Sequence, residues 1–139
     1  MAVVVFDSDV LIGFLNANDA HHADAIEHLR DSLAPGTRRM ISAVNYSEIL
    51  IGPIKAGKRA RDHVEAMLVC FSIEIIIVDA ALAQRAAAVR TRTNLKLPDA
   101  YALATALHAE HNGHEDVRLA SFDKAVLHAH AELHPNRPS

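Results

Sequence analysis

Four short segments with the composition of β-strands alternate along this chain with segments of helical periodicity, and this alternation constrains the fold more than any other feature. The strand-like segments are VVVF, RRMIS, IEIIIV and VRLAS, and one or two helical segments follow each of them. Parallel strands need long crossover connections, which are usually helices. The sequence therefore predicts a three-layer α/β/α fold with a central parallel sheet of four to five strands. The fifth would be a short strand in AELHP near the C-terminus.

Several local features make more detailed predictions. Ser42 is the expected N-cap of the helix AVNYSEILIG, and Gly52 and Pro53 are expected to end or bend that helix. The segment 73–78 (IEIIIV) is β-branched almost throughout and is the clearest candidate for a buried strand. Cys70 lies in an apolar stretch, which favours a position in the core.

Composition indicates one globular domain. The chain has 139 residues, 50% of them hydrophobic, and we expect residues 1–135 to form the domain and 136–139 a short polar tail. No apolar run reaches the roughly 18 residues that span a bilayer, and the N-terminus lacks the pattern of a secretory signal. The single cysteine excludes an internal disulfide framework. We therefore expect a cytoplasmic protein without a membrane partner.

Charge is unevenly distributed. The formal net charge of −3 argues mildly against a nucleic-acid partner, yet the basic residues gather in two places. The first basic cluster is Lys58, Arg59 and Arg61, and the second is Arg90, Arg92 and Lys96. Such clusters are either solvated helix faces or contacts with a nucleic-acid backbone.

Four acidic residues stand at comparable positions in the predicted elements. Asp7 and Asp123 follow the first and fourth strands, and Asp99 lies in the first turn of a long helix. Glu48 lies in the helix after the second strand, and its spacing from Val44 and Ile51 places it on the same face as those apolar residues. Asp7 and Asp123 can each cap a helix, Asp99 can complement a helix dipole, and Glu48 can be an ordinary exposed acid. None of these roles explains why all four are expected at one edge of the sheet, where open α/β sheets bind ligands. Clustered carboxylates repel one another, and a hard cation such as Mg²⁺ or Mn²⁺ would relieve that repulsion and could activate water.

The motifs FDSDVLI, SAVNYSEIL, LPDAYALATAL and LASFDKAV, in this order and spacing, resemble the four acidic motifs of PIN-domain nucleases. The resemblance runs from Val3 to Pro135, and the short single-domain form resembles the VapC-type toxins of bacterial toxin–antitoxin pairs. It implies a PIN-like fold and a metal-dependent endoribonuclease that cleaves structured RNA of the tRNA or rRNA class. It also implies a small cognate antitoxin that inhibits the enzyme, and a homodimer.

The resemblance assigns roles position by position. The acidic quartet, and hence the expected catalytic set, is Asp7, Glu48, Asp99 and Asp123. Asp7, Asp99 and Asp123 would hold one or two Mg²⁺ or Mn²⁺ ions, while Glu48 would orient water or support the ligands. Ser121 matches the small hydroxyl residue two positions before the last acid. Asp9 falls where the family often has Asn, Ser or Thr, so its role as ligand, support or cap stays open.

One further set of residues concerns the partner. The apolar residues of the first helix and the segment 49–54 either form a groove for an antitoxin helix or belong to the core, and the core is favoured for most of them.

Two other functions compete with the nuclease. The FDSD motif also resembles the nucleophile motif of haloacid-dehalogenase-type phosphatases, with Asp7 as nucleophile and Asp9 as acid–base. That family needs a later paired acidic motif, whereas SFDK offers a single acid. The second is a PIN-like module that binds RNA or protein without cleaving. The ten histidines lack cysteine partners for structural zinc and are expected mostly at the surface.

Overall fold

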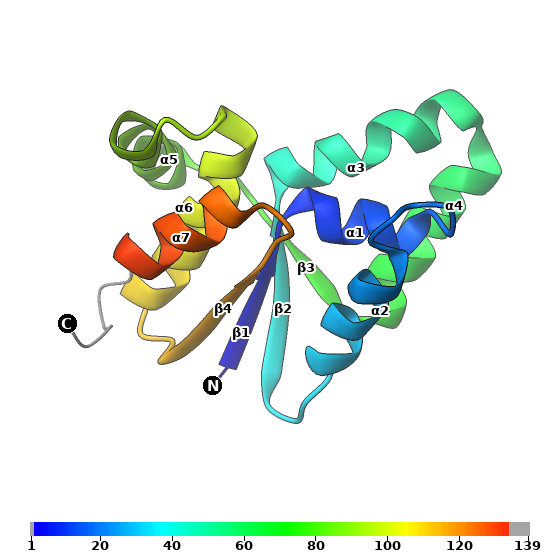
Figure 1. Ribbon diagram of the computed structural model, residues 1–139, viewed down its shortest axis with the longest axis horizontal. Coiled ribbons are helices and arrows are strands. Elements are labelled where there is room, and N and C mark those ends of the chain that lie inside the picture. The colour runs from blue at the N-terminus through cyan, green and yellow to red at the C-terminus, as the bar shows by residue number, and fades with distance from the viewer. Residues whose placement is uncertain (1, 134–139) are drawn as a thin grey trace.

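A parallel four-stranded sheet crosses the middle of the molecule and carries helices on both faces (Figure 1). The structure is a computed structural model and describes residues 2–133. The strands lie side by side in the order β3-β2-β1-β4, and their bounds are β1 Ala2–Phe6, β2 Thr37–Ser42, β3 Ile73–Ile76 and β4 Asp116–Ala120. The predicted three-layer fold with a parallel sheet is confirmed, with four strands in the described residues.

The helices divide into two groups, one on each face of the sheet. One face carries α1 to α4 and the other carries α5 to α7, as Figure 1 shows to the right and left of the sheet. Their bounds are α1 Ser8–Leu15, α2 His22–Asp31, α3 Ala43–Ala56, α4 Lys58–Cys70, α5 Ala80–Thr93, α6 Leu97–His111 and α7 Lys124–Leu133. None of the helices in residues 2–133 has the length and apolarity needed to cross a membrane.

Strand β1 contributes side chains to two hydrophobic cores, one on each face of the sheet. Successive side chains of a strand point to opposite faces. Val3 and Val5 therefore join the core beneath α5, α6 and α7, whereas Val4 and Phe6 join the core beneath α1 to α4. All four side chains are buried, which explains why the VVVF run is apolar at every position.

The strand order places the ends of β1 and β4 together. The chain passes from β1 through β2 to β3 in one direction and then returns to pair β4 with the free side of β1. Phe6 pairs with Ala120, and the Asp7 N–H donates to the Ala120 carbonyl at 2.9 Å. This reversal is a topological switch point, where open α/β sheets bind their ligands at the carboxyl ends of the strands.

Two predictions about burial are wrong. The segment IEIIIV forms the edge strand β3, which ends at Ile76, and Ile77 beyond it is 80% exposed. The helices centre on β1 and β2, so Glu74 and Ile75 of the edge strand stay exposed. Cys70, the last residue of α4, is exposed as well.

The element boundaries confirm one prediction and correct two. Ser42 caps α3, since its Oγ accepts the Asn45 N–H at 3.0 Å. Pro53 does not end α3, which continues to Ala56. Gly57, with φ at +120°, makes the turn into α4. The prediction of a strand in AELHP (131–135) is wrong for residues 131–133, which form the last turn of α7. Residues 134 and 135 of that segment and the predicted tail 136–139 lie outside the described residues.

Candidate active site

Asp7 lies at the switch point and is held on both of its oxygens. It follows β1 directly and caps α1, with Oδ1 accepting the Ser8 N–H at 2.8 Å. Its Oδ2 accepts the Ser121 hydroxyl at 2.8 Å, and the side chain is only 2% exposed. The sheet, the helix cap and the neighbouring strand end therefore fix this carboxylate from three directions.

Ser121 links the acids that follow β1 and β4. A hydroxyl has one proton to donate. The 2.8 Å bond to Asp7 takes that proton, and the Asp9 Oδ2 lies farther away at 3.5 Å. The Ser121 oxygen also accepts the Asp123 N–H at 3.0 Å. Ser121 therefore lies between Asp7 and Asp123 and connects the two residues through its hydroxyl group.

Asp9 joins the same cluster from the first turn of α1. Its Oδ2 accepts the Phe122 N–H at 3.0 Å and so ties α1 to the loop after β4. Asp9 therefore supports the loop that carries Asp123, and its other carboxylate oxygen, Oδ1, is buried without a hydrogen-bond partner among residues 2–133.

Asp123 caps a helix in the way its sequence position suggests. Its Oδ1 accepts the backbone N–H groups of Ala125 at 2.9 Å and Val126 at 3.4 Å, at the start of α7. Asp7 and Asp123 are thus both N-caps and members of the acidic cluster, so the two roles coexist.

Glu48 and Asp99 come from helices and are connected through Asn45. The Glu48 Oε1 accepts the Ser8 hydroxyl at 2.8 Å and the Asn45 Nδ2 at 3.1 Å. The same Nδ2 donates to the carbonyl of Pro98, the residue before Asp99, at 3.0 Å. Asn45 is fully buried, and its Oδ1 accepts the Ser42 hydroxyl at 2.6 Å. It thus joins the start of α3 to the start of α6.

The acids perturb one another electrostatically. Burial, followed by the charge of Asp9, raises the pKa of Asp7 from 3.8 to about 7. Burial also raises the pKa of Asp99, and the charges of Asp123 and Glu48 raise it further, while Lys96 lowers it. Burial likewise raises the pKa of Asp9, with a contribution from Asp123. The quartet and Asp9 therefore lie within electrostatic reach of one another.

The chemistry of this cluster fits a hard divalent cation. Its donors are carboxylate oxygens, its charges are uncompensated, and one buried oxygen of Asp9 lacks a proton donor. Within residues 2–133, however, no three His, Cys, Asp or Glu side chains are already grouped to hold an ion. Binding would therefore require the carboxylates to converge further than they do in this structure.

Comparison with known proteins decides the family. The family model of the PIN domain matches residues 4–132. The chain belongs to the PIN domain family. The match spans β1 to α7 and so includes all four acids, whose catalytic roles remain predictions.

Solved structures agree with this assignment. A toxin–antitoxin complex from Klebsiella pneumoniae is 27% identical, covering 88% of this chain and 87% of that one, with a TM-score of 0.60. Mycobacterium tuberculosis VapC20, described as a Sarcin-Ricin loop cleaving toxin, is 22% identical with a TM-score of 0.62 and covers 88% and 92%. VapBC2 from Rickettsia felis, bound to a promoter DNA fragment, is 16% identical with a TM-score of 0.60 and covers 88% and 100%. The last two show the fold alone. A comparison with curated proteins finds no significant match.

The family match removes the phosphatase alternative. The PIN domain family model matches residues 4–132 and so covers the FDSD motif on which the phosphatase resemblance rested.

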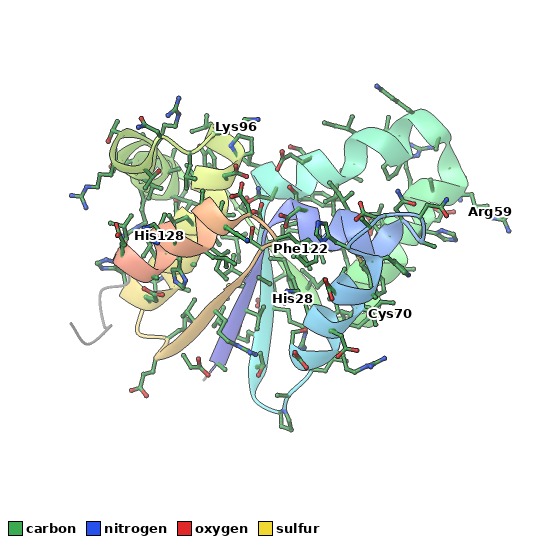
Figure 2. All side chains as sticks on the ribbon, viewed as in Figure 1. His28, Arg59, Cys70, Lys96, Phe122 and His128 are labelled. Carbon is green, nitrogen blue, oxygen red and sulfur yellow. The ribbon has the colours of Figure 1, made fainter. Side chains whose placement is uncertain are left out.

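The two basic clusters differ in their position relative to the site. Lys96 stands at the start of α6 and acts electrostatically on Asp99. Arg59 projects from the far end of the α3–α4 hairpin, as Figure 2 shows. In the first cluster, Lys58 is paired with Asp62 at 2.7 Å. Lys96 is thus close enough to the acids to act on Asp99, whereas Arg59 lies far from them.

The proposed partner groove is mostly core. Val10 and Leu11 are fully buried and Ile49 is 2% exposed, as the core interpretation predicted. Ile51 and Ile54 are instead 58% and 59% exposed on the outer side of α3. Glu48 therefore does not share a buried face with Ile51, as the helical spacing had suggested.

Sequence reasoning missed Asn45 and Ser8 as members of the site. Both lie inside the acidic motifs, and both contact Glu48. Asn45 stands three residues after Ser42 and three before Glu48, which is the spacing of neighbours on one helix face. That spacing was the available signal.

Proposed function

We propose that this PIN domain is the endoribonuclease toxin of a VapC-type toxin–antitoxin pair and that it cleaves structured RNA. One observation carries the proposal: acids from β1, α3, α6 and the end of β4 gather at the switch point of the sheet, within electrostatic reach of one another. An arrangement of buried, mutually repelling carboxylates is costly for a fold, and a phosphodiester-cleaving metal site is a use that offsets the cost.

Mg²⁺ or Mn²⁺ is the proposed cofactor, with Asp7, Asp99 and Asp123 as its ligands. When bound, such an ion supplies charge stabilisation at a phosphoryl oxygen and a more acidic water. Asp9 is close enough to Asp123 to sense its charge, and its buried Oδ1 makes it a further candidate ligand.

The remaining groups position these acids. Ser121 holds Asp7 and the Asp123 backbone at a fixed separation through one hydroxyl. Ser8 and Asn45 both donate to the Glu48 Oε1, which sets the orientation of that carboxylate. We assign the Glu48 Oε2 to orienting the attacking water. The second basic cluster, which includes Lys96, would contact the RNA backbone without reading its sequence.

The comparisons support a protein partner. The Klebsiella pneumoniae structure is a toxin–antitoxin complex, and the similar fold of the Mycobacterium tuberculosis toxin makes ribosomal RNA a substrate to test alongside tRNA. A cognate antitoxin, a homodimer and a cytoplasmic location are accordingly parts of the proposal.

Cleavage of total RNA tests this function. Purified protein would be incubated with Mg²⁺, with Mn²⁺ and with EDTA, beside an Asp99→Asn variant purified identically. Asp116→Asn is the matched control, because Asp116 is exposed at the opposite end of β4. We expect discrete metal-dependent fragments from the wild type and the control, and none from Asp99→Asn. Equal activity in folded wild type and Asp99→Asn, both free of antitoxin, would contradict the proposal.

A further inference from the structure

An aromatic stack lies beside the acids and takes no part in holding them. The Phe122 ring stacks on the His21 imidazole with centroids 4.5 Å apart and planes 18° apart. His28 meets the Phe122 ring edge-on at 5.5 Å, and Figure 2 shows the two residues next to each other at the centre of the molecule. Phe122 stands between Ser121 and Asp123, so the stack begins inside the proposed catalytic motif.

Backbone hydrogen bonds anchor both residues of the stack. The Phe122 backbone N–H is bound by Asp9, and a side chain at Gly13 would come within 3.6 Å of the ring, which shows how closely α1 approaches it. The backbone N–H of His21 donates to the Asp19 Oδ1 at 2.8 Å. A fixed aromatic surface loses little conformational entropy when it binds a planar ligand.

The surroundings select the kind of ligand. A cavity of about 390 Å³ borders the stack and is lined by Asp9, Ile12, Asp19, His21, Phe122 and Asp123. Asp19 is the one carboxylate in this wall that is not a proposed metal ligand, and it can accept an N–H donor from a neutral base while it would repel a free phosphate. His21 is exposed, so its ring can continue the stack outward.

We propose that His21, held flat on Phe122, is the stacking surface for one unpaired base of the RNA next to the cleaved bond. This inference rests on the proposed nuclease function and adds a specificity-determining residue to it. Unpaired bases are commonly recognised by stacking on aromatic side chains or histidine, combined with hydrogen bonds to the base edge. A phosphate held by the proposed metal and Lys96 would leave the adjacent base within reach of this cavity.

The test couples a change in the protein to a change in the RNA. The probe is the shortest RNA that the wild type cleaves, made with an abasic nucleotide at each position flanking the cleaved bond in turn. Loss of a stacked base lowers binding by about tenfold or more. We expect His21→Ala to lower kcat/KM about tenfold on intact RNA and to cause no further loss when one particular base is absent.

Two variants complete the design. His21→Phe keeps a flat ring and should retain the wild-type rate on intact RNA. His128→Ala removes an exposed histidine from the outer side of α7 and should leave every rate unchanged. If His21→Ala has no effect, or lowers the rate equally on intact and abasic RNAs, the stacking proposal is wrong while the nuclease stands. If His21→Ala weakens inhibition by the antitoxin but leaves cleavage unchanged, the surface binds protein instead. A wild type that cleaves no RNA would overturn both proposals.

Discussion

The two halves of the acidic site are built in different ways. In the strand half, Asp7 and Asp123 follow adjacent strands and share the Ser121 hydroxyl. In the helix half, Glu48 and Asp99 come from α3 and α6, and Asn45 connects the residues around them. The strand half is positioned by the sheet itself, whereas the helix half depends on one buried amide between two helices.

This difference indicates where stability and activity separate. Asp7 caps a helix and accepts a buried hydroxyl, so its environment is part of the folded core. The side chain of Asp99 is only half-buried, and the neighbouring acids make its charge unfavourable in the metal-free protein. Changes in the strand half should therefore alter folding and activity together, while loss of the Asp99 charge should alter activity more than folding.

The largest expected effect belongs to the helix half. Asp99→Asn should lower the cleavage rate by about a thousandfold or more, because a lost metal ligand removes several kcal/mol of transition-state stabilisation. The free energy of unfolding of the metal-free protein should stay unchanged or rise slightly, since a repelled charge is removed. Single-turnover cleavage and urea denaturation measure the two quantities. A large loss of stability in Asp99→Asn would show that Asp99 belongs to the folded core in the same way as Asp7.

The contribution of the strand half to the free energy of unfolding should depend on pH, through the carboxyl group of Asp7. The raised pKa of Asp7 means that its folded environment favours the protonated form, so this stabilisation is complete below pH 3.8 and is lost as the pH rises through about 7. The upper limit of this change is on the order of 4 kcal/mol. Urea denaturation of wild type and Asp7→Asn, with chelator present, measures it. If both proteins show the same pH dependence of stability, Asp7 does not carry the effect.

Removing the hydroxyl of the strand half should cost stability. In Ser121→Ala, the buried Asp7 Oδ2 and the Asp123 N–H both lose their partner, which we expect to lower the free energy of unfolding by about 1–3 kcal/mol. Ser47→Ala is the control, because Ser47 is exposed and bonds only to its own helix through Val44. Chemical denaturation measures the free energy of unfolding of both variants, and an equal loss in the two would contradict a stabilising role of the Ser121 hydroxyl.

The amide of the helix half should affect activity. Asn45→Ala removes the connection between Glu48 and the start of α6, and we expect cleavage to fall by roughly 10–100-fold, as for residues that orient metal ligands. Asn18→Ala, in an exposed turn, is the control. Wild-type activity in a folded Asn45→Ala variant would show that the hydrogen bonds of Asn45 to Glu48 and Pro98 are not needed for cleavage.

The smallest expected effect concerns RNA binding. Lys96→Ala should weaken binding several-fold at low salt, and Arg59→Ala should weaken it less, because Arg59 lies at the far end of the α3–α4 hairpin. Filter binding at several salt concentrations measures both affinities. Equal effects, or effects that persist at high salt, would argue against a backbone contact beside the helix half.

The sequence predicts the strand half better than the helix half for a physical reason. An acid directly after a strand inherits its position from the sheet, so the places of Asp7 and Asp123 follow from the alternation of elements. The place of Glu48 depends instead on how α3 packs, and the apolar spacing misleads because Ile51 is exposed. The bridge by Asn45 depends on the approach of α6, which no local pattern records.

The sheet itself shows the same limit. The central position of β1 is visible in its continuous apolar run, but the segment IEIIIV, apolar at every position except Glu74, lies at the edge. Strand order is a long-range property, so the exposure of Ile77 could not be deduced from its neighbours. The end of α3 was misplaced because the helix tolerates Pro53 and turns only at Gly57.

Calorimetric titration of Mn²⁺ into the metal-free protein shows whether the strand half and the helix half together hold a divalent cation. Asp79→Asn is the control, because Asp79 also caps a helix but is exposed and outside the cluster. We predict that wild type and Asp79→Asn bind Mn²⁺ alike, and that Asp7→Asn and Asp99→Asn each weaken binding at least about tenfold. Undiminished binding in either site variant, or equal weakening in Asp79→Asn, would contradict a shared metal site.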